Sequence, residues 1–375
     1  MDNFKNIRVI CQCLHVLNIS GFRSIFHDHR VHKLYSGKAI ELHLIAQLLQ
    51  LPSYDLIAEQ LHAHPTLRKA IDLESISASQ LSRKTKTLCT ENLQHLFYWL
   101  IRQINERTKP GKKQASPLGA LHLIDGTNIS LPHSFGRWAQ CGKKKTAVHL
   151  HVSLVATDPS MVYPGQVIAT TSNVSEQAIS LELVLDKEAT YVMDRGYEKC
   201  QHFEDWTRDG FRFVIRVRDR LRLFPIEGRQ RSVPTAHNGV NILRDEDVLT
   251  NKTTIPIRLV EFEDDKQRRY RLLTSRWDVD AHEIAQIYKC RWQIELFFKW
   301  VKQHLKLVKL HSAHPTAVWN QIFLSLIAYA VSLLVKLQLQ TDKSQWEVMK
   351  LLQTYMYKDW QELLEALHRV PSRRS

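Results

Sequence analysis

The period of the hydrophobic pattern changes along this chain, and that change most strongly limits the folds it can adopt. Up to about residue 105 the apolar residues recur as in helices, with "KAIELHLIAQLLQL" stopping at Pro52 and "SYDLIAEQLHAH" at Pro65. The segment "RTKPGKKQASP" at 107–117 holds two prolines, a glycine and four basic residues, and is the clearest linker. After it, apolar residues alternate or run together as in strands.

The order of segments after the linker predicts a mixed α/β fold. We expect strands in "LGALHLID", "TNISLP", "AVHLHVSLVAT" and "YPGQVIATT", then a helix in "SEQAISLELVL" and a short strand in "ATYVMDRGYEK". More strands are expected over about 211–277, and helices from about 280 onward. A β-rich block therefore interrupts the predicted core. The expected boundaries are a helical domain at 1–106, a linker at 107–117, a core at 118–210 and 279–340, an insertion at 211–278 and a helical tail at 341–375.

The charge balance favours an acidic partner. The net charge is +14, which is most common in proteins that meet nucleic acid, although ribosomal and membrane-surface proteins share it. The six cysteines are scattered without a CxxC pair, which fits a reducing cytoplasm. No signal peptide is visible, and "IFLSLIAYAVSLLV" at 322–335 is shorter than the roughly 20 residues of a membrane span. We expect a buried helix there and no membrane partner.

A polar, basic helix start is expected at about Ser77, a good N-cap residue. The side chains on or near one face of that long helix are Ser79, Gln80, Arg83, Lys84 and Lys86. Two short helices precede it, as in a helix-turn-helix element whose second helix reads DNA. The solvated face of a small helical domain is an equally good interpretation.

The segment "YKCRWQIELFFKWVKQHLKL" at 288–307 predicts one continuous amphipathic helix with charges beside its apolar stripe. At about 100° per residue, four polar positions fall within about 60° of one another. They are Tyr288, Arg291, Glu295 and Lys302, and Lys299 borders them. Taken alone, Arg291 and Glu295 could form a surface ion pair worth only about 0.2–0.5 kcal/mol.

Two further acids change that interpretation. Asp125 and Asp194 each follow an apolar strand, and each precedes a glycine by one or two residues. Either could simply cap a turn. Carboxylates from two strands and Glu295 of the helix could instead converge, but like charges resist joint ionisation. Divalent cations would remove that cost, and Mg²⁺ prefers carboxylate oxygens. A pair of such ions supports phosphoryl displacement.

Three motifs carry a family resemblance. The spacing Tyr, two residues, Arg, three, Glu, six, Lys is matched at every position from Tyr288 to Lys302, and "DGT" at 125–127 and "DRGY" at 194–197 precede it in order. In these motifs, over roughly 118–330, the chain resembles a DDE transposase of the bacterial insertion sequence 4 family. "TSNVSEQ" at 171–177 departs from the pattern, because we expect an acid near 173 and find asparagine at that position.

The resemblance implies an RNase H-like core in which Asp125, Asp194 and Glu295 bind Mg²⁺, with Mn²⁺ as a substitute. It implies cleavage at the inverted repeats of an insertion sequence, joining to target DNA, a homodimer bridging the ends, and a bacterial cytoplasmic location. The DNA contacts expected are Tyr288, Arg291, Lys302, Lys299, Lys143, Lys144, Lys145, Arg83 and Lys84. Trp292 could stack on a flipped base or pack in the core, and Trp277 is a weaker candidate.

Two alternatives remain open from the residues. The first is a metal-dependent endonuclease of RNase H-like fold, which would cut DNA without joining it. The second is an inactive, sequence-specific DNA-binding protein. Tyr288, Arg291 and Lys302 on one helix face favour a transposase over a simple endonuclease. An endonuclease need not hold a cut DNA end until that end is joined to another DNA. The intact trio of acids disfavours the second.

Overall fold

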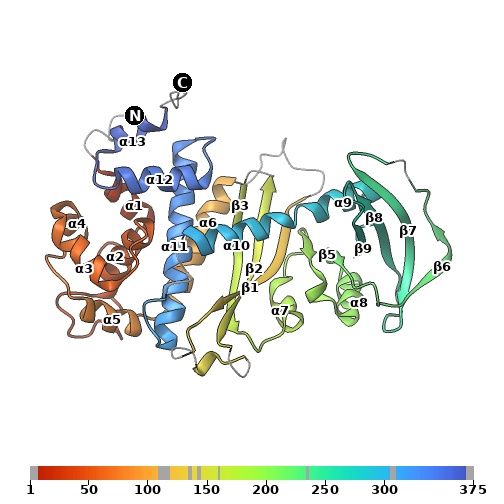
Figure 1. The fold of residues 1–375 in the computed structure, drawn as a ribbon, viewed down its shortest axis with the longest axis horizontal. Coiled ribbons are helices and arrows are strands. Elements are labelled where there is room, and N and C mark those ends of the chain that lie inside the picture. The colour runs from red at the N-terminus through yellow and green to blue at the C-terminus, as the bar shows by residue number, and fades with distance from the viewer. Residues whose placement is uncertain are drawn as a thin grey trace. The chain divides into compact units, whose positions relative to one another are not determined.

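The computed structural model describes residues 7–108, 119–133, 137–141, 145–158, 161–233, 236–304 and 310–368. Two compact units divide the chain. The first comprises Met1–Thr108, Leu131–Trp138 and Trp300–Ser375, and the second comprises Lys109–Ser130 and Ala139–Lys299. The predicted change of period is confirmed, because the described part of the first unit is built of helices and the second is built around a sheet (Figure 1).

The helical unit packs around one long apolar helix, α11 (Pro315–Leu339). Contacting it are α1 (Val9–Leu17), α2 (Ser36–Leu48), α5 (Ala78–Thr87), α6 (Thr90–Thr108) and α12 (Gln345–Tyr355). The unit also contains α3 (Tyr54–Ala63), α4 (Pro65–Ile71) and α13 (Trp360–Leu367). Every residue of α2 is buried, so its polar side chains, Glu41 among them, lie inside the unit.

Helix α11 is longer than the apolar segment 322–335 from which it was predicted. With 25 residues and a mean hydropathy of 2.0 over its most apolar window, it is the one helix of the described chain that is long and apolar enough to cross a membrane. The expectation that this stretch is too short was wrong, because the helix extends beyond 322–335 at both ends. The expectation of a buried helix is confirmed, since 78% of its most apolar window is buried inside the protein.

Helix boundaries in this unit follow local chemistry. The Ser77 hydroxyl accepts the Gln80 N–H, and the Gln80 side chain accepts the Ser77 N–H, which forms the capping box at the start of α5. Pro65 occupies the first turn of α4, where its missing N–H costs nothing. The single long helix predicted from Ser77 is wrong, because Leu88 and Cys89 separate α5 from α6.

The second unit contains a nine-stranded mixed sheet in the order β3-β2-β1-β4-β5-β9-β8-β7-β6. Its strands are β1 (Leu121–Ser130), β2 (Ala147–Asp158), β3 (Met161–Thr171), β4 (Thr190–Met193), β5 (Arg212–Arg216), β6 (Leu223–Gln230), β7 (Val240–Thr250), β8 (Ile257–Asp264) and β9 (Arg269–Thr274). Strands β1, β4 and β5 are parallel, and the other pairs are antiparallel. Each edge strand contains a proline, Pro164 in β3 and Pro225 in β6.

The strands predicted as an inserted block extend this same sheet. Strand β9 pairs with β5, so β6 to β9 continue the sheet that contains β1 and β4. The segment "TNISLP" adds no separate strand, because β1 runs from Leu121 through Ser130. Helices α7 (Glu176–Leu183) and α8 (Cys200–Asp209) supply Leu183, Phe203 and Trp206 to the core cluster, where the sheet contributes Met193 and Phe213.

Candidate carboxylate site

The first two acids lie beside each other on parallel strands. In the pairing of β1 with β4, Ile124 is opposite Met193, and that pairing ends there. Asp125 and Asp194 are the next residues on the two strands. Asp125 Oδ1 accepts the Gly126 N–H at 2.8 Å, and Asp194 Oδ1 accepts the Arg195 N–H at 2.7 Å. The parallel sheet therefore positions both carboxylates at the same edge.

The local conformation at Asp125 differs from the prediction. Strand β1 continues to Ser130 through its antiparallel pairing with β2, so it does not end at Asp125. Asp125-Gly126 is therefore not a turn, and the turn-capping interpretation of this acid is wrong. The interpretation fits Asp194 better, because that residue is the N-cap of the short 3₁₀ helix Arg195–Tyr197.

The predicted helix over 288–307 is broken near its start. Helix α9 (Ala281–Lys289) ends before Cys290, and α10 (Trp292–His304) begins two residues later. The Arg291 N–H donates to the Tyr288 carbonyl at 3.0 Å, and the Ile294 N–H donates to the Arg291 carbonyl at 3.1 Å. These i to i+3 bonds form a tighter turn than an α-helix. The regular helical wheel therefore does not apply across Arg291.

The Arg291 guanidinium joins two of the predicted acids. Its Nη1 lies 3.2 Å from Asp125 Oδ2, and its Nη2 pairs with Glu295 Oε1. The Arg291 side chain is only 15% exposed. The Arg291–Glu295 pair considered from the sequence is present, but it is not an isolated surface pair, because the same arginine also binds an acid 166 residues earlier. Asp125 and Glu295 meet around one cation.

Burial and neighbouring charges perturb the groups in this site. The pKa of Asp125 is raised to about 6. Burial is the largest cause and the charges of Asp194 and Glu176 act in the same direction, while the Gly126 N–H and Arg291 oppose the rise. Burial, together with the charge of Asp194, raises the pKa of Tyr288 to about 12. Burial opposes the charge of Arg291, but its anionic surroundings outweigh burial and raise the pKa of that guanidinium.

Glu176 is an acid of this site that the sequence analysis missed. It begins α7, whose N-cap Ser175 accepts the Ala178 N–H. A Cβ built on Gly196 would lie 2.0 Å from Glu176 Oε2, so this carboxylate is packed against the residue two positions after Asp194. Glu176 lies inside "TSNVSEQ", three residues after the position where an acid was expected. The sequence did contain a signal for Glu176, because an acid at the start of a predicted helix precedes the strand that ends at Asp194.

Both glycines of the acid motifs make room for an acid–histidine pair. His149 Nε2 lies 3.9 Å from Glu176 Oε1. A Cβ built on Gly126 would lie 2.3 Å from His149 Nε2, as the one on Gly196 would meet Glu176. Any larger residue at either position would have to displace the pair. The sequences "DG" and "DRG" are thus explained by close packing at the site.

The donor chemistry of the site suits a hard divalent cation. Carboxylate oxygens are the ligands that Mg²⁺ and Mn²⁺ prefer. The hydroxyl of Tyr197 is buried without a hydrogen-bond partner in the described residues, and burial followed by the charges of Glu176, Asp125 and Asp194 raises the pKa of this phenol. As the side chains stand, the described residues include no group of three His, Cys, Asp or Glu that could hold a metal ion. The Arg291 guanidinium supplies the positive charge between Asp125 and Glu295.

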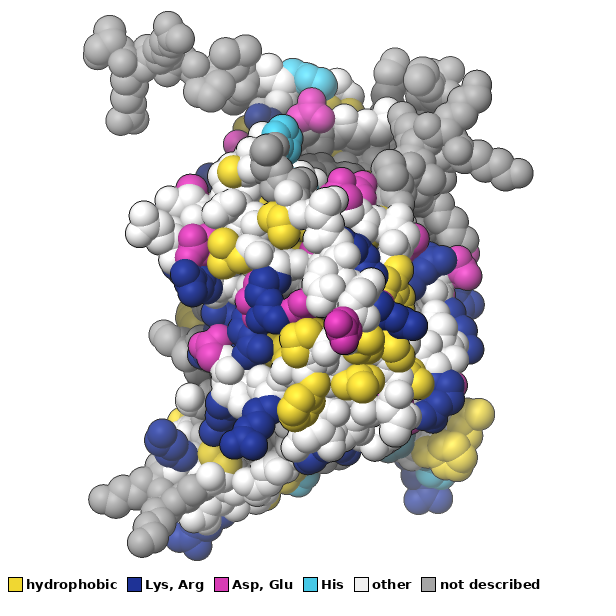
Figure 2. All heavy atoms as spheres, turned by 90° about the vertical axis from the view of Figure 1, so that its right-hand side faces the viewer, with side chains coloured by type: hydrophobic (Ala, Val, Ile, Leu, Met, Phe, Trp, Pro, Cys, Tyr) yellow, Lys and Arg dark blue, Asp and Glu magenta, His cyan; other side chains and the backbone are white. Residues whose placement is uncertain are grey.

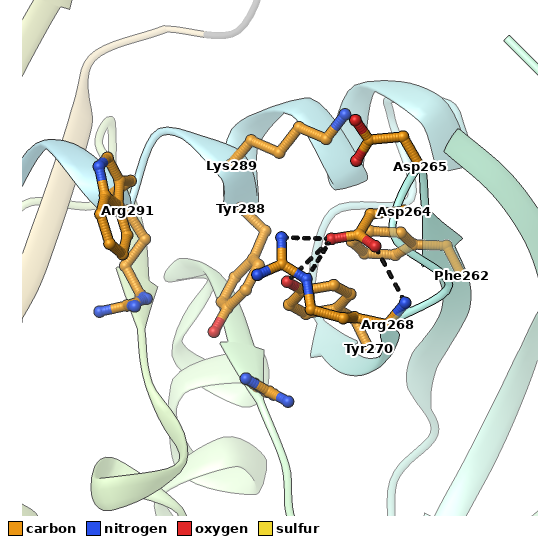
Figure 3. Close-up of a pocket in the computed structure, with 10 residues that line it drawn as sticks. Phe262, Asp264, Asp265, Arg268, Tyr270, Tyr288, Lys289 and Arg291 are labelled. Carbon is orange, nitrogen blue, oxygen red and sulfur yellow. Dashed lines mark hydrogen bonds and ion pairs between the residues drawn. The ribbon is translucent and has the colours of Figure 1, made fainter. Parts of the chain in front are cut away.

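A cavity of about 400 Å³ lies beside Arg291. Its lining is basic and aromatic, with two acids: Arg216, Phe262, Asp264, Asp265, Arg268, Tyr270, Tyr288, Lys289, Arg291 and Trp292. Figure 3 shows Asp264 paired with Arg268 next to Tyr270 and Tyr288. The Arg216 guanidinium carbon lies 4.8 Å from the centre of the Tyr270 ring, and the sequence analysis had singled out neither residue. The cavity could receive a planar, anionic group.

The two candidate tryptophans have different surroundings. Trp292 is 59% exposed and lines the cavity, so the core-packing interpretation is wrong. Trp277 follows β9 and donates its Nε1–H to Asp247 Oδ1 at 3.0 Å. It is not among the residues that line this cavity.

The predicted basic contacts are dispersed. Lys299 and Lys145 are exposed in the second unit, and Arg83 is exposed on α5 of the first. Lys302 is half-buried on the part of α10 that groups with the helical unit, and burial lowers its pKa. Lys84 is buried in an ion pair with Asp28, so the structure contradicts its role as a surface DNA contact. Lys143 and Lys144 lie outside the described residues.

The fold and the site together define a protein with carboxylates where the pairing of two parallel strands, β1 and β4, ends inside a mixed sheet. Such a centre can support metal-dependent phosphoryl transfer. The family model described as "Transposase DDE domain" matches residues 119–331, and the chain belongs to that family, of the insertion sequence 4-like type. Members of this family depend on divalent metal ions.

Curated relatives have matching descriptions. A probable transposase for insertion sequence element IS5377 from Geobacillus stearothermophilus is 28% identical over 68% of this chain and 66% of its own length. The putative transposase y4zB of Sinorhizobium fredii is 34% identical over 56% and 59%. A putative transposase for element IS4SA of Synechocystis is 23% identical over 76% and 79%. The chain thus spans slightly less than two thirds of the first relative's length.

A solved structure is also similar in part. The cryo-EM structure of a piggyBac transposase synaptic complex with hairpin DNA superposes with a TM-score of 0.44 and 11% sequence identity. The match covers 99% of this chain and 81% of that one.

Proposed function

We propose that this protein is a transposase that cuts DNA at the ends of an insertion sequence and joins those ends to target DNA. The observation that supports the proposal is that Asp125 shares Arg291 with Glu295 and lies beside Asp194 on the neighbouring strand, all within the family-matched region. Asp125 and Asp194 follow paired residues of parallel strands, and Arg291 binds both Asp125 and Glu295. Three acids so far apart in sequence have no structural need to meet, because mutual repulsion makes their proximity costly.

The core of the second unit supports an RNase H-like fold. Three antiparallel strands, β3, β2 and β1, are followed in the sheet by the parallel strands β4 and β5. In this proposal the remaining strands are an insertion that widens the sheet before the chain returns to the third acid. The helical unit would be a separate DNA-binding domain. The expected helical domain at 1–106 forms only part of it, because Trp300–Ser375, expected as core and tail, group with the same unit.

Asp125, Asp194 and Glu295 would hold Mg²⁺, with Mn²⁺ as a substitute. Bound there, divalent cations would activate the attacking oxygen and stabilise the leaving oxygen of a phosphodiester. Glu176 would support the same site through its packing against Gly196 and its contact with His149. Arg291 would hold a backbone phosphate through its planar fork, which suits phosphate as well as carboxylate.

The cavity beside Arg291 would receive DNA near the cut. Trp292 offers an aromatic face for a base, and Arg216 and Arg291 offer charge for its phosphate. Lys299, Lys302 and Lys145 are further proposed backbone contacts. Figure 2, which faces β6 and β7, shows Lys and Arg side chains around hydrophobic ones. Arg220, Arg222 and Arg229 are exposed in or next to β6 and fit an extended DNA contact.

The proposed partners are duplex DNA with terminal inverted repeats, target DNA and a second copy of the chain bridging two ends. A DNA substrate and six free cysteines fit a cytoplasmic protein. A metal-dependent endonuclease remains the second candidate, because the same carboxylates could support hydrolysis without joining.

The test uses linear DNA carrying the inverted repeats that flank the coding region, with Mg²⁺ or with EDTA. Wild-type protein should nick and join the ends only with the cation, and Glu295→Gln should lower both by at least about 1,000-fold, on the scale of a lost catalytic group. Glu188→Gln, at an exposed position elsewhere on the unit, is the matched control. Cutting without joining would favour the endonuclease. Joining by Glu295→Gln at the wild-type rate would refute the assignment of the acids.

A further inference from the structure

A short loop of the helical unit exposes two adjacent apolar side chains. Ile25 is 86% exposed and Phe26 is 88% exposed, more than any other large hydrophobic residue of the described chain. They lie between α1 and α2, in the segment "FRSIFHDHRVHK" at 22–33, which we name the apolar loop. Single exposed hydrophobic residues are ordinary, but two neighbours exposed this far indicate a surface that another molecule covers.

The apolar loop is fixed to α5 by a buried ion pair. Asp28, 6% exposed, accepts the backbone N–H groups of Ser24 at 2.6 Å and Ser36 at 3.0 Å. The same carboxylate pairs with Lys84 of α5, which is 8% exposed. The Arg23 guanidinium carbon also lies 4.4 Å from the centre of the Tyr35 ring. These contacts hold the base of the loop while its tip, Ile25 and Phe26, faces solvent.

The surroundings of the tip are basic. Arg23, Arg30 and Lys33 are exposed in the apolar loop, together with three histidines, and the loop's one acid, Asp28, is buried. Helix α5 adds exposed Arg83 and Lys86. An acid near the loop, Glu91, interacts with His27. The partner should therefore be anionic as well as able to accept apolar side chains.

The loop and α5 form one continuous surface. A cavity of about 410 Å³ lies between residues 31–34 and α5, and both Lys33 and Arg83 line it. Lys33 Nζ donates to Ser75 Oγ at 2.8 Å, just before the N-cap of α5. Because the Asp28–Lys84 pair fixes the same two segments, the apolar tip and the basic face of α5 are presented together.

We propose that the apolar loop and α5 bind duplex DNA, with Ile25 and Phe26 inserted as a wedge into the minor groove. Arg83 and Lys86 hold the phosphate backbone beside it, and the wedge opens a base step and bends the duplex. Proteins that bend DNA from the minor groove combine apolar wedges and basic side chains in this way. A second copy of the chain is a poorer occupant, because a symmetric contact would bring two basic faces together. The inference rests on the proposed function only for the identity of the partner as DNA.

The experiment measures binding and bending without catalysis. Full-length Asp125→Asn protein in EDTA is mixed with an end-labelled duplex carrying the inverted repeat, followed by fluorescence anisotropy and by energy transfer between the duplex ends. Ile25→Ser/Phe26→Ser should abolish the bend and weaken binding by about 10-fold or more, on the scale of a few buried apolar contacts. Leu185→Ser, at a site that is 66% exposed in the other unit, should change neither.

A second variant distinguishes the contribution of the basic face of α5 to DNA binding from that of Ile25 and Phe26. Arg83→Gln/Lys86→Gln should weaken binding to all duplexes and lower the salt slope by about two, one for each lost phosphate contact. Melting temperatures within a few degrees of wild type would show that the exposed substitutions leave the fold intact.

Two results would overturn the proposal. The first is an unchanged bend and affinity in the Ile25→Ser/Phe26→Ser variant. The second is a loss of dimer mass in light scattering without any change in DNA binding, which would make the apolar loop a contact between copies. Cleavage of the same DNA by wild-type protein with Mg²⁺ tests the proposed function separately. Failure of cleavage with a normal bend would therefore leave this inference standing.

Discussion

Arg291 binds Asp125 through a contact of 3.2 Å while its other terminal nitrogen holds Glu295. The guanidinium thus supplies the positive charge at the place where the family's divalent cation would be bound. A cation entering the site would compete with this arginine for the same two carboxylates.

Replacing Arg291 should therefore change cation binding and activity in opposite directions. In Arg291→Gln the carboxylates lose their internal counter-charge, so added Mg²⁺ or Ca²⁺ should raise the melting temperature more than in wild type, by mass action. Cleavage should fall by at least about 10-fold if Arg291 makes the proposed bidentate phosphate contact, because that contact would be lost. Arg216→Gln, which leaves the carboxylate pair intact, is the control for the thermal shift. An equal shift in Arg291→Gln and wild type would contradict the competition.

Gly196→Ala tests the close packing of Glu176. The added Cβ would lie 2.0 Å from Glu176 Oε2, so the carboxylate must move. We expect a loss of about 1–3 kcal/mol in the free energy of unfolding, as in other overpacked sites. Glu176→Ala/Gly196→Ala should recover most of that loss while remaining inactive. Denaturant unfolding of the four proteins in the cycle measures the coupling, and additive effects would show that the two residues do not meet.

The buried pair Asp28–Lys84 should be costly to break. Asp28→Asn leaves a buried ammonium without its partner, so the free energy of unfolding should fall by about 3–5 kcal/mol. Asp205→Asn is the matched control, because Asp205 pairs with Arg208 at 3.4 Å and both side chains are exposed, at 41% and 57%. That change should cost less than about 1 kcal/mol. Similar losses in the two variants would show that burial of the Asp28 pair has no energetic effect.

The same pair has a defined pH dependence. Burial opposes ionisation of Asp28, but hydrogen bonds from Lys84, Ser36 and Ser24 outweigh it and lower the pKa. The stabilisation is therefore present above the unfolded pKa of about 3.9 and is lost as the pH falls through the lower folded value. The difference in the free energy of unfolding between wild type and Asp28→Asn should therefore become smaller in acid. Denaturant unfolding of both proteins at pH 7 and in acid would measure it.

Glu41 should act in the opposite sense. Burial in α2 raises its pKa to about 7, against the opposing charge of Lys38. Its stabilising contribution is full below the unfolded value of about 4.3 and is lost as the pH rises through about 7. The free energy of unfolding of Glu41→Gln minus that of wild type should therefore be larger at pH 8 than at pH 4. The increase should be up to about 3 kcal/mol. The exposed Glu59→Gln should show no such gain. A pH-independent difference for Glu41→Gln would refute the prediction.

The sequence predicted the parts of the site that depend on order and spacing. Strands before Asp125 and Asp194 were visible as short apolar runs, and the spacing of Tyr288, Arg291 and Glu295 identified the third motif. The break at Cys290 was not visible, because the pattern continues across it and only the i to i+3 bonds reveal the tighter turn. That turn is what brings Arg291 to Asp125.

Residues recruited by tertiary packing were the ones missed. Glu176 has no spacing relation to the other acids, and only its approach to Gly196 reveals its place. Lys84 was predicted to be a surface cation because it lies in the polar, basic start of a helix with Arg83 and Lys86. Its side chain instead pairs with Asp28 inside the unit. The sequence gives the sign and chain position of each charged residue, but it does not identify the residue with which that charge pairs in the fold.

The prolines at the two borders of the nine-stranded sheet restrict how copies of this chain can associate. Pro164 in β3 and Pro225 in β6 lack the N–H that an added strand would need to complete its ladder. Growth of the sheet from one molecule into the next is therefore discouraged on both sides. The proposed pairing of two copies on DNA would therefore use side-chain surfaces or the nucleic acid itself.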